Sequence, residues 1–158
     1  MKINTLQEAK QAAFNGAVKG LSFQEWKVCQ YSSSDGCLWN TGQPGFHCAV
    51  GWLIPWESQK DRQAGTASAA FIDRLFSPPL QEWVDKAHKE WNTLTFYEAG
   101  GSDSAKFSDF VESLQAAHDF DVTKSKVNHD KNPTPKKMRA SFRRLAKEHK
   151  LTWPASVT

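Results

Sequence analysis

The stretch TLQEAKQAAFNGA, residues 5–17, decides the fold class, because it carries the clearest helix signal in the chain. Thr5 is a favourable N-cap, and Glu8 three residues later completes a capping box. Apolar residues then recur at helical spacing: Leu6, Ala9, Ala13, Phe14 and Ala17. The pattern predicts an amphipathic helix that ends near Gly16 to Gly20, because glycine is common where a helix stops.

Two helices are predicted between residues 66 and 91. Thr66 can cap the first, which runs to Phe76 and is stopped by Pro78 and Pro79. Ser77, just before the two prolines, can cap the second. The second helix carries an apolar stripe with helical spacing: Leu80, Trp83, Val84, Ala87 and Trp91.

Two more amphipathic helices follow a break at Gly100-Gly101-Ser102. The first starts near Ser104, and its stripe is Phe107, Phe110, Val111, Leu114, Ala117 and His118. Thr134 followed by Pro135 is a favourable start for the second. The stripe of this last helix is Met138, Phe142, Leu145, Ala146 and His149. The polar residues 124–134 are predicted to form an exposed basic loop.

A small β-hairpin is predicted within residues 26–40. Trp26–Tyr31 and Cys37–Asn40 are short β-type runs, and the Ser-Ser-Ser-Asp-Gly sequence between them is typical of a turn. Residues 42–45 form a second turn, and a helical turn is expected near Cys48. The helices still supply most of the core. The predicted fold is therefore mainly α, or α+β with a minor β-hairpin: one compact domain, residues 1–158, of four to five helices.

Composition favours a cytoplasmic protein without membrane association. The 158 residues suit a single core, and no apolar run approaches the roughly 20 residues that cross a bilayer. Residues 1–10 lack the basic start and the apolar centre of an export signal. The chain has three cysteines, an odd number that argues for reduced thiols rather than a disulfide framework.

Basic residues are concentrated in one part of the chain. Residues 124–150 carry ten lysines and arginines against two acidic residues, a local charge of +8. The net charge of the whole chain is +3, so the remaining residues carry −5. This polarity favours an anionic partner.

The last predicted helix holds the candidate binding residues, which surround its apolar stripe: Lys136, Lys137, Arg139, Arg143, Arg144, Lys147 and Lys150. Such a surface suits nucleic-acid phosphates or an acidic protein surface. The alternative is neutralisation by the chain's own acidic helices, which carry Glu82, Asp85, Glu90, Asp103, Asp109, Glu112 and Asp119. Apart from the apolar-stripe Phe142, the segment has no aromatic residue for stacking on single-stranded bases.

Four residues of the kinds that bind zinc lie within twenty positions: Cys29, Cys37, His47 and Cys48. Their intervals of eight, ten and one residues match no zinc knuckle, and adjacent residues converge poorly on one tetrahedral ion. Core packing is the favoured interpretation, so no metal is expected. No phosphate-binding loop occurs either, so no cofactor is expected.

Two residues are candidates for catalysis. Cys48 near a helix start has the position of a thiol nucleophile, with His47 or His118 as the base. The surrounding run Cys48–Ile54 is apolar, which is more typical of an inert core cysteine. At a predicted helix end, His118 more simply interacts with the last carbonyls or with Asp119. The favoured interpretation is that the chain is not an enzyme.

Three blocks of sequence resemble a group of small uncharacterised proteins encoded by bacteriophages and prophages. The run FHCAVGWLIP at Phe46–Pro55 resembles the group's Cys-Ala-(Ile/Val)-Gly-x-Leu-Ile-Pro signature. Phe110–Asp119 resembles its Phe-x-x-x-Leu-Gln-x-x-His-Asp helix, and Leu145–Leu151 resembles its closing Leu-Ala-x-Glu-(His/Tyr)-x-Leu pattern. The basic residues 124–137 depart from the group. The resemblance implies a phage origin and carries no activity or cofactor with it.

Three functions follow from these patterns. The first is a non-catalytic phage accessory protein that binds a host or defence-system macromolecule, a protein or a nucleoprotein complex, through the basic surface in the host cytoplasm. The second is direct nucleic-acid binding by the same surface. The third is an enzyme that uses Cys48 and His118 on a small substrate. The sequence indicates no oligomeric state.

Overall fold

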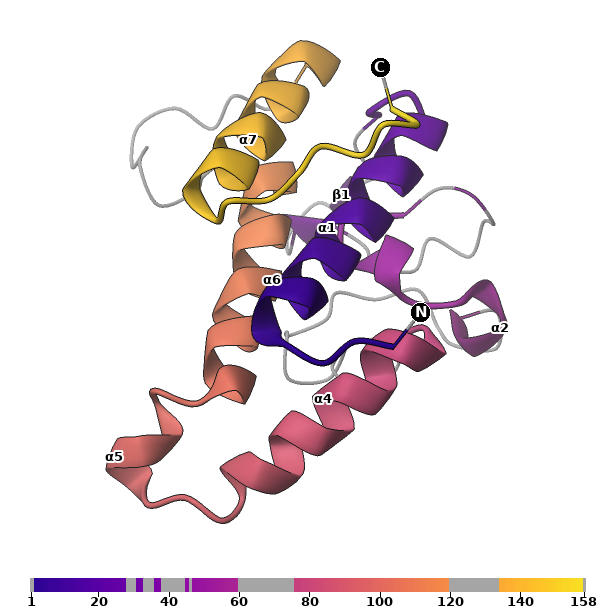
Figure 1. Cartoon of the computed structure of the whole chain (residues 1–158). Helices are drawn as coiled ribbons and strands as arrows, with labels where there is room; N and C mark the ends of the chain where they lie inside the picture. The colour runs from indigo at the N-terminus through magenta and orange to yellow at the C-terminus, as the bar shows by residue number, and fades with distance from the viewer. Residues whose placement is uncertain are drawn as a thin grey trace.

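The computed structural model describes residues 2–27, 31–32, 36–37, 45, 47–59, 76–119 and 134–157. Helices dominate these residues (Figure 1). In chain order the elements are α1 (Leu6–Phe23), β1 (Tyr31–Ser32), β2 (Gly36–Cys37), the 3-10 helix η1 (Gly51–Leu53), α2 (Trp56–Gln59), α4 (Pro78–Trp91), α5 (Phe96–Ala99), α6 (Asp103–Asp119) and α7 (Pro135–Glu148). The predicted mainly α fold is therefore confirmed. In the described part of the chain, no helix has the length and apolarity to span a membrane.

α1 packs against α4, α6 and η1, and the core forms around it (Figure 1). The predicted capping box is present at its start. The Glu8 N–H donates to Thr5 Oγ1 at 3.2 Å, and the Thr5 N–H donates to Glu8 Oε2 at 3.1 Å. The buried face of α1 combines alanines with larger apolar residues such as Phe14 and Leu21. Small side chains on this face allow the neighbouring elements to approach the helix axis.

α1 is longer than predicted, because Gly16 and Gly20 do not end the helix. They lie within it, where η1 side chains pack closely against its backbone. A Cβ at Gly20 would overlap the Trp52 ring, and a Cβ at Gly16 would lie 2.9 Å from the Leu53 side chain of η1. The helix ends instead in a Schellman motif without glycine, in which the Trp26 N–H donates to the Leu21 carbonyl at 2.7 Å. Trp26 therefore belongs to this turn, and its predicted place in a β-strand is wrong.

The predicted β-hairpin is present in short form. The antiparallel register pairs Tyr31 with Cys37 and Ser32 with Gly36. The helical turn expected near Cys48 is also present and leads into η1. The short helix α2 follows η1 and ends at Gln59. The predicted helix over residues 66–75, the turn at residues 42–44 and the basic loop up to residue 133 lie outside the described residues.

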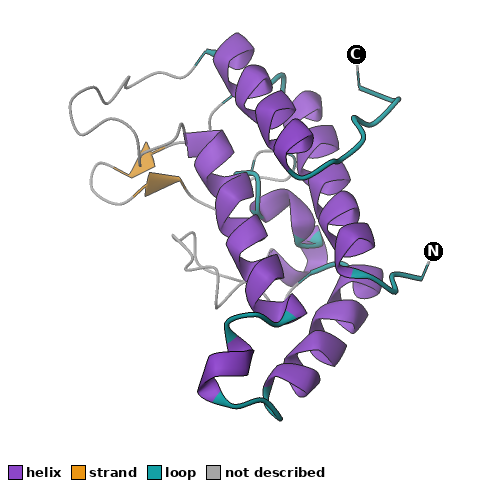
Figure 2. Ribbon diagram, turned by 60° about the vertical axis from the view of Figure 1, so that its left-hand side comes forward, coloured by secondary structure: helices purple, strands orange, loops and turns teal. Residues whose placement is uncertain are grey.

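α4 and α6 are joined through α5 at a corner of the molecule (Figure 1). α4 starts at Pro78, so both prolines lie in its first turn. α6 begins directly after the predicted break at residues 100–102. α5 itself was not predicted, although Thr95 and Glu98 form its capping box, with the Thr95 N–H donating to Glu98 Oε2 at 3.0 Å. In Figure 2, α5 lies at the end of the molecule away from α7.

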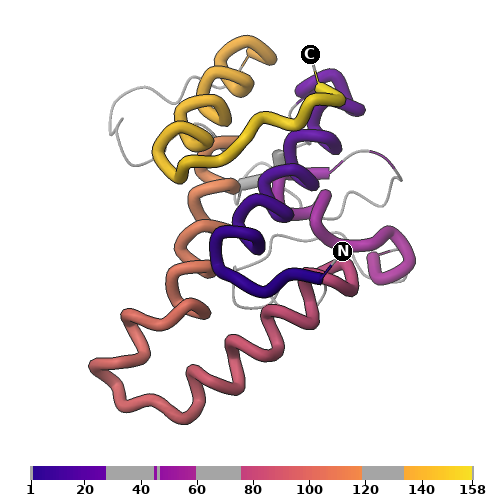
Figure 3. Tube along the Cα trace, viewed as in Figure 1, coloured from indigo at the N-terminus to yellow at the C-terminus, as the bar shows by residue number. Residues whose placement is uncertain are grey.

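α7 packs against α6, and the chain then returns along α1 (Figure 3). Four residues of the predicted stripe are buried, with Met138 and Phe142 fully covered, and the fifth, His149, is half-buried. Residues 151–157 are tied to α1 by Gln11. Its Nε2 donates to the Thr152 carbonyl at 2.8 Å, and its Oε1 accepts from the Thr152 N–H at 2.8 Å. The first and last described segments therefore form one layer of the fold.

Candidate functional site

The predicted basic residues lie together on one side of α7. At about 100° per residue, the six within the helix occupy an arc of roughly 160° on the side away from the buried stripe. Thr134 fixes the start of the helix, because its side chain accepts a hydrogen bond from the Lys137 N–H at 3.4 Å. We call the set the α7 basic face, and its members are Lys136, Lys137, Arg139, Arg143, Arg144, Lys147 and Lys150.

Most of the α7 basic face is open to solvent, and only Arg139 is half-buried. Within the described part of the chain, no carboxylate forms an ion pair with five members: Lys136, Arg143, Arg144, Lys147 and Lys150. The alternative that the acidic helices neutralise this surface therefore has no support for these five. Their charge remains available to an external anion.

Two members of the face are held in place by aromatic rings. The Arg139 guanidinium carbon lies 5.3 Å from the Trp26 ring centroid, and that of Arg143 lies 5.5 Å from the Trp153 centroid. The two indoles stack on each other, with centroids 6.0 Å apart and planes inclined by 14°. Such cation–π contacts contribute about 0.5–1 kcal/mol each at exposed sites. An indole carries no net charge, so the rings position the guanidiniums without neutralising them.

The indole pair is assembled from distant parts of the chain. Trp26 comes from the turn that ends α1 and is 1% exposed. Trp153 follows α7, and its Nε1 donates to the Val157 carbonyl at 3.0 Å. The Phe14 ring meets Trp153 edge-on, with centroids 5.8 Å apart. Sequence patterns indicated the cations but gave no signal for this support, because the contacts join segments far apart in sequence.

His149, at the end of α7, is biased toward its neutral form by its surroundings. Its ring meets Phe110 edge-on at a centroid distance of 4.9 Å, and the Lys10 ammonium lies 5.5 Å from the same Phe110 ring. Burial lowers the pKa of His149, the charge of Lys10 lowers it further, and Glu148 acts in the opposite direction. The imidazole is therefore mainly neutral at pH 7.

The two candidate catalytic residues lie in the core. Cys48 is 2% exposed, and its Sγ accepts a hydrogen bond from the Gly51 N–H at 3.3 Å. His118 is 0% exposed and sits in the last turn of α6. A substrate would have to open the packed interior to reach either side chain. The position of Cys48 agrees with the core-packing role favoured from the sequence, and His118 lies at the helix end where the sequence placed it.

The candidate metal ligands do not form a site among the described residues. Cys29 and the side chain of Cys37 lie outside the described part of the chain. In the described part, no three His, Cys, Asp or Glu residues are grouped so that they could hold a metal ion. The His47 ring packs edge-on against Trp52 at 5.0 Å, and its backbone N–H donates to Gln24 Oε1 at 3.0 Å. These contacts give His47 a structural setting beside η1.

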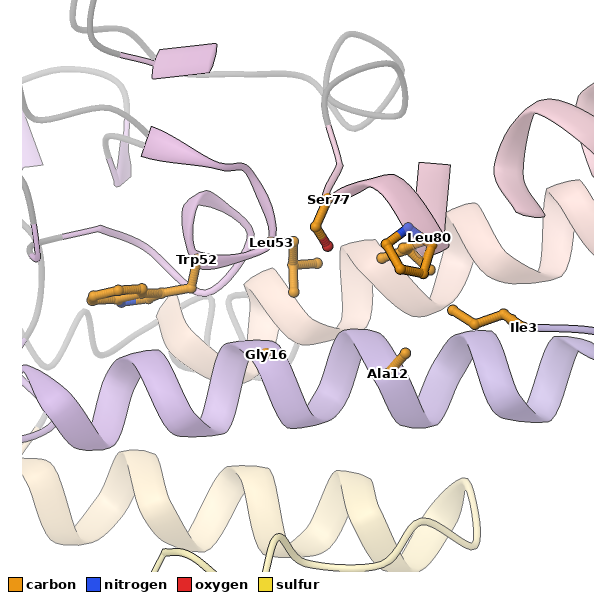
Figure 4. A pocket seen from close by; sticks show the side chains of 8 residues that line it. Ile3, Ala12, Gly16, Trp52, Leu53, Ser77 and Leu80 are labelled. Carbon is orange, nitrogen blue, oxygen red and sulfur yellow. The ribbon is translucent and has the colours of Figure 1, made fainter. Parts of the chain in front are cut away.

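Sequence reasoning did not indicate a shallow apolar pocket of about 220 Å³ beside α1 (Figure 4). It lies between α1, η1 and the start of α4, and its lining includes Ile3, Ala12, Trp52, Leu53 and Leu80. Ser77 contributes the only polar side chain of that lining. A pocket that orients a substrate usually has several converging polar groups. This pocket therefore gives no indication of a reaction.

Sequence reasoning also missed an aromatic corner between α4 and α6, formed by Trp91, Leu94, Phe96 and Tyr97. Phe96 is 90% exposed and Tyr97 is 93% exposed, with their rings edge-on at 5.8 Å. Both lie in α5, whose capping box holds the turn in place. The spacing of Thr95 and Glu98 could have predicted this helix, because it is that of a capping box. The two aromatic residues then fall in the first turn of the helix.

No known protein family, curated protein or solved structure matches this chain in sequence or fold. The candidate site therefore has to be judged by its own geometry and charge.

Proposed function

We propose that the chain is a non-catalytic phage accessory protein that binds a host or defence-system macromolecule in the host cytoplasm through the α7 basic face. The observation that carries this proposal is a set of mostly exposed cations, two of which are fixed on indole rings. Five of its members form no ion pair with a carboxylate of the residues that the structure describes. Groups that attract an anion without being quenched internally are suited to an external partner. The phage origin rests on the sequence resemblance alone.

The residues of the resemblance support a division between scaffold and binding surface. Within the signature, Cys48, Ala49, Val50, Leu53 and Ile54 are all buried. η1, which contains Leu53, packs against α1, so the signature describes the scaffold. The α7 basic face lies on the exposed side of its helix, where substitution changes binding without changing the core.

The test compares two variants that change net charge equally. Lys136→Glu with Arg144→Glu reverses the charge of two exposed members of the face, and a glutamate at residue 136 suits a helix N-terminus. Lys89→Glu with Lys106→Glu is the matched control, because both lysines are exposed on α4 and α6. We expect wild type and control to capture the same partner from host lysate at low salt, and the face variant to lose it.

The captured partner is identified by mass spectrometry with and without nuclease treatment. Equal capture by the face variant and the control, or capture of nothing specific by wild type at low salt, would contradict the proposal. Circular dichroism of all three proteins checks that the helical fold is retained.

A further inference from the structure

We infer that the α7 basic face binds the phosphate backbone of double-stranded nucleic acid without reading its base sequence. This inference rests on the proposed function and names the partner class. It follows from the composition of the face, from what covers its aromatic residues, and from the side chains that the helix directs outward.

The composition of the face argues against a protein partner. Specific protein interfaces have a core of aromatic or aliphatic anchors and are depleted in lysine. Among the described residues, the exposed large hydrophobic side chains all lie outside α7 and the segment that follows it: Phe23, Trp91, Leu94, Phe96 and Tyr97. Protein–DNA interfaces are instead polar and strongly positive. The α7 basic face has the polar, strongly positive composition of a protein–DNA interface.

The setting of the aromatic residues argues against single-stranded nucleic acid. Single-strand binding proteins offer exposed aromatic rings on which successive bases stack. Here the nearby indole of Trp26 is buried beneath Arg139, and that of Trp153 is half-buried beside Arg143. The rings are used to hold guanidiniums and offer no open platform, so a duplex backbone is the better match.

The outward side chains of α7 are mainly cations, which suit contacts with phosphates. Apart from the cations, the exposed positions of α7 include Pro135, Ala140 and Glu148, and the helix contains neither Asn nor Gln to read adenine. The helix is about 21 Å long at 1.5 Å per residue, so its cations can span several phosphates of one duplex. Contacts of this type position a protein on nucleic acid and carry no sequence information.

The inference is tested by fluorescence anisotropy with purified protein and labelled oligonucleotides. Two duplexes of unrelated sequence and one single strand are titrated between 50 and 200 mM salt. We expect the two duplexes to bind within threefold of each other and the single strand to bind more weakly. With about five phosphate contacts, the salt slope is about −4.5, which corresponds to a loss of roughly 500-fold over this salt range.

The matched variants give the decisive comparison. Lys136→Glu with Arg144→Glu should reduce the magnitude of the salt slope by about 2, because two phosphate contacts are lost. Lys89→Glu with Lys106→Glu has the same net charge as this face variant but should retain the salt slope of the wild type. Equal weakening by both pairs would overturn the inference, because binding would then follow net charge and not the α7 basic face.

Other outcomes separate this inference from the proposed function. Tighter binding to the single strand, or a preference above tenfold for one duplex, would also overturn it. If no duplex binds at 50 mM salt while nuclease-treated lysate still yields a partner that only the face variant loses, the partner is a protein. The proposed function would then stand and the inference would fall.

Discussion

Lys150 occupies a position that glycine usually takes at the end of a helix. Its φ is 54°, in the left-handed region, and it forms the C′ residue of a Schellman motif after α7. The Lys150 N–H donates to the Lys147 carbonyl at 3.3 Å, and the Leu151 N–H donates to the Ala146 carbonyl at 2.8 Å. A left-handed conformation costs a residue with a Cβ roughly 1–2 kcal/mol. The chain therefore keeps a lysine where glycine would be free of this strain.

Lys150→Gly is expected to separate stability from binding. Removing the Cβ relieves the left-handed strain, so the free energy of unfolding should rise by about 1 kcal/mol. Removing the charge should weaken binding to the anionic partner. Urea unfolding measures the first effect and anisotropy with duplex DNA the second. An unchanged or lower stability would show that Lys150 is not strained.

The pKa of His149 should report the charge of Lys10. In the folded protein the pKa of His149 is lowered mainly by burial and further by the charge of Lys10. The contribution of neutral His149 to the free energy of unfolding is therefore fully present above the ordinary histidine pKa of 6.5. It is lost as the pH falls through the pKa of the folded protein. Lys10→Gln should raise the folded pKa of His149 toward the ordinary value. Histidine ring shifts followed by NMR between pH 4 and 8, roughly the range in which histidine titrates, measure it. If the pKa of His149 stays the same or falls in this variant, Lys10 does not lower it in the wild type.

At the scale of elements, N-caps were predictable only in part, since Ser77 precedes α4 without a side-chain cap hydrogen bond, and the end of α1 was not predictable. Thr5 and Thr134 were identified as N-caps from local sequence, and both accept the expected hydrogen bond. α1 and α7 both end in Schellman motifs whose C′ residues, Glu25 and Lys150, are not glycine. Without a glycine signal the end of α1 could not be placed from sequence. Gly20 resembled a helix stop in the sequence. Its actual role is to leave room for the Trp52 ring, which only the fold shows.

Gly20→Ala is expected to destabilise the fold, although alanine favours a helix. The added methyl would overlap the Trp52 ring, whose Nε1 is fixed by a 2.7 Å hydrogen bond to Gln24 Oε1. Overpacking of this kind costs about 1–3 kcal/mol. Gly100→Ala is the control, because a Cβ there meets nothing within 4 Å and should leave stability unchanged or slightly higher. Thermal unfolding of both variants decides, and equal midpoints would show that η1 moves aside.

At the scale of the whole molecule, charge distribution was predictable and long-range support was not. The members of the α7 basic face follow from residue type and helical period. The indole stack of Trp26 and Trp153 beneath it required the fold, because the two residues come from opposite ends of the chain. The aromatic corner at α5 was missed for a related reason, since its exposure depends on how α4 and α6 meet. The α7 basic face and the α5 corner thus lie at opposite ends of the molecule (Figures 1 and 2).

The return of residues 151–157 along α1 has a consequence during synthesis on the ribosome. α1 emerges early, whereas Thr152 and Trp153, which pair with Gln11 and cover Phe14, are translated more than a hundred codons later. Until then the part of α1 that this segment covers, which includes Phe14, stays exposed, and transiently exposed apolar surface is prone to aggregation. Closing the fold must wait for this contact between remote segments, which slows maturation relative to a helical protein built from neighbouring pairs.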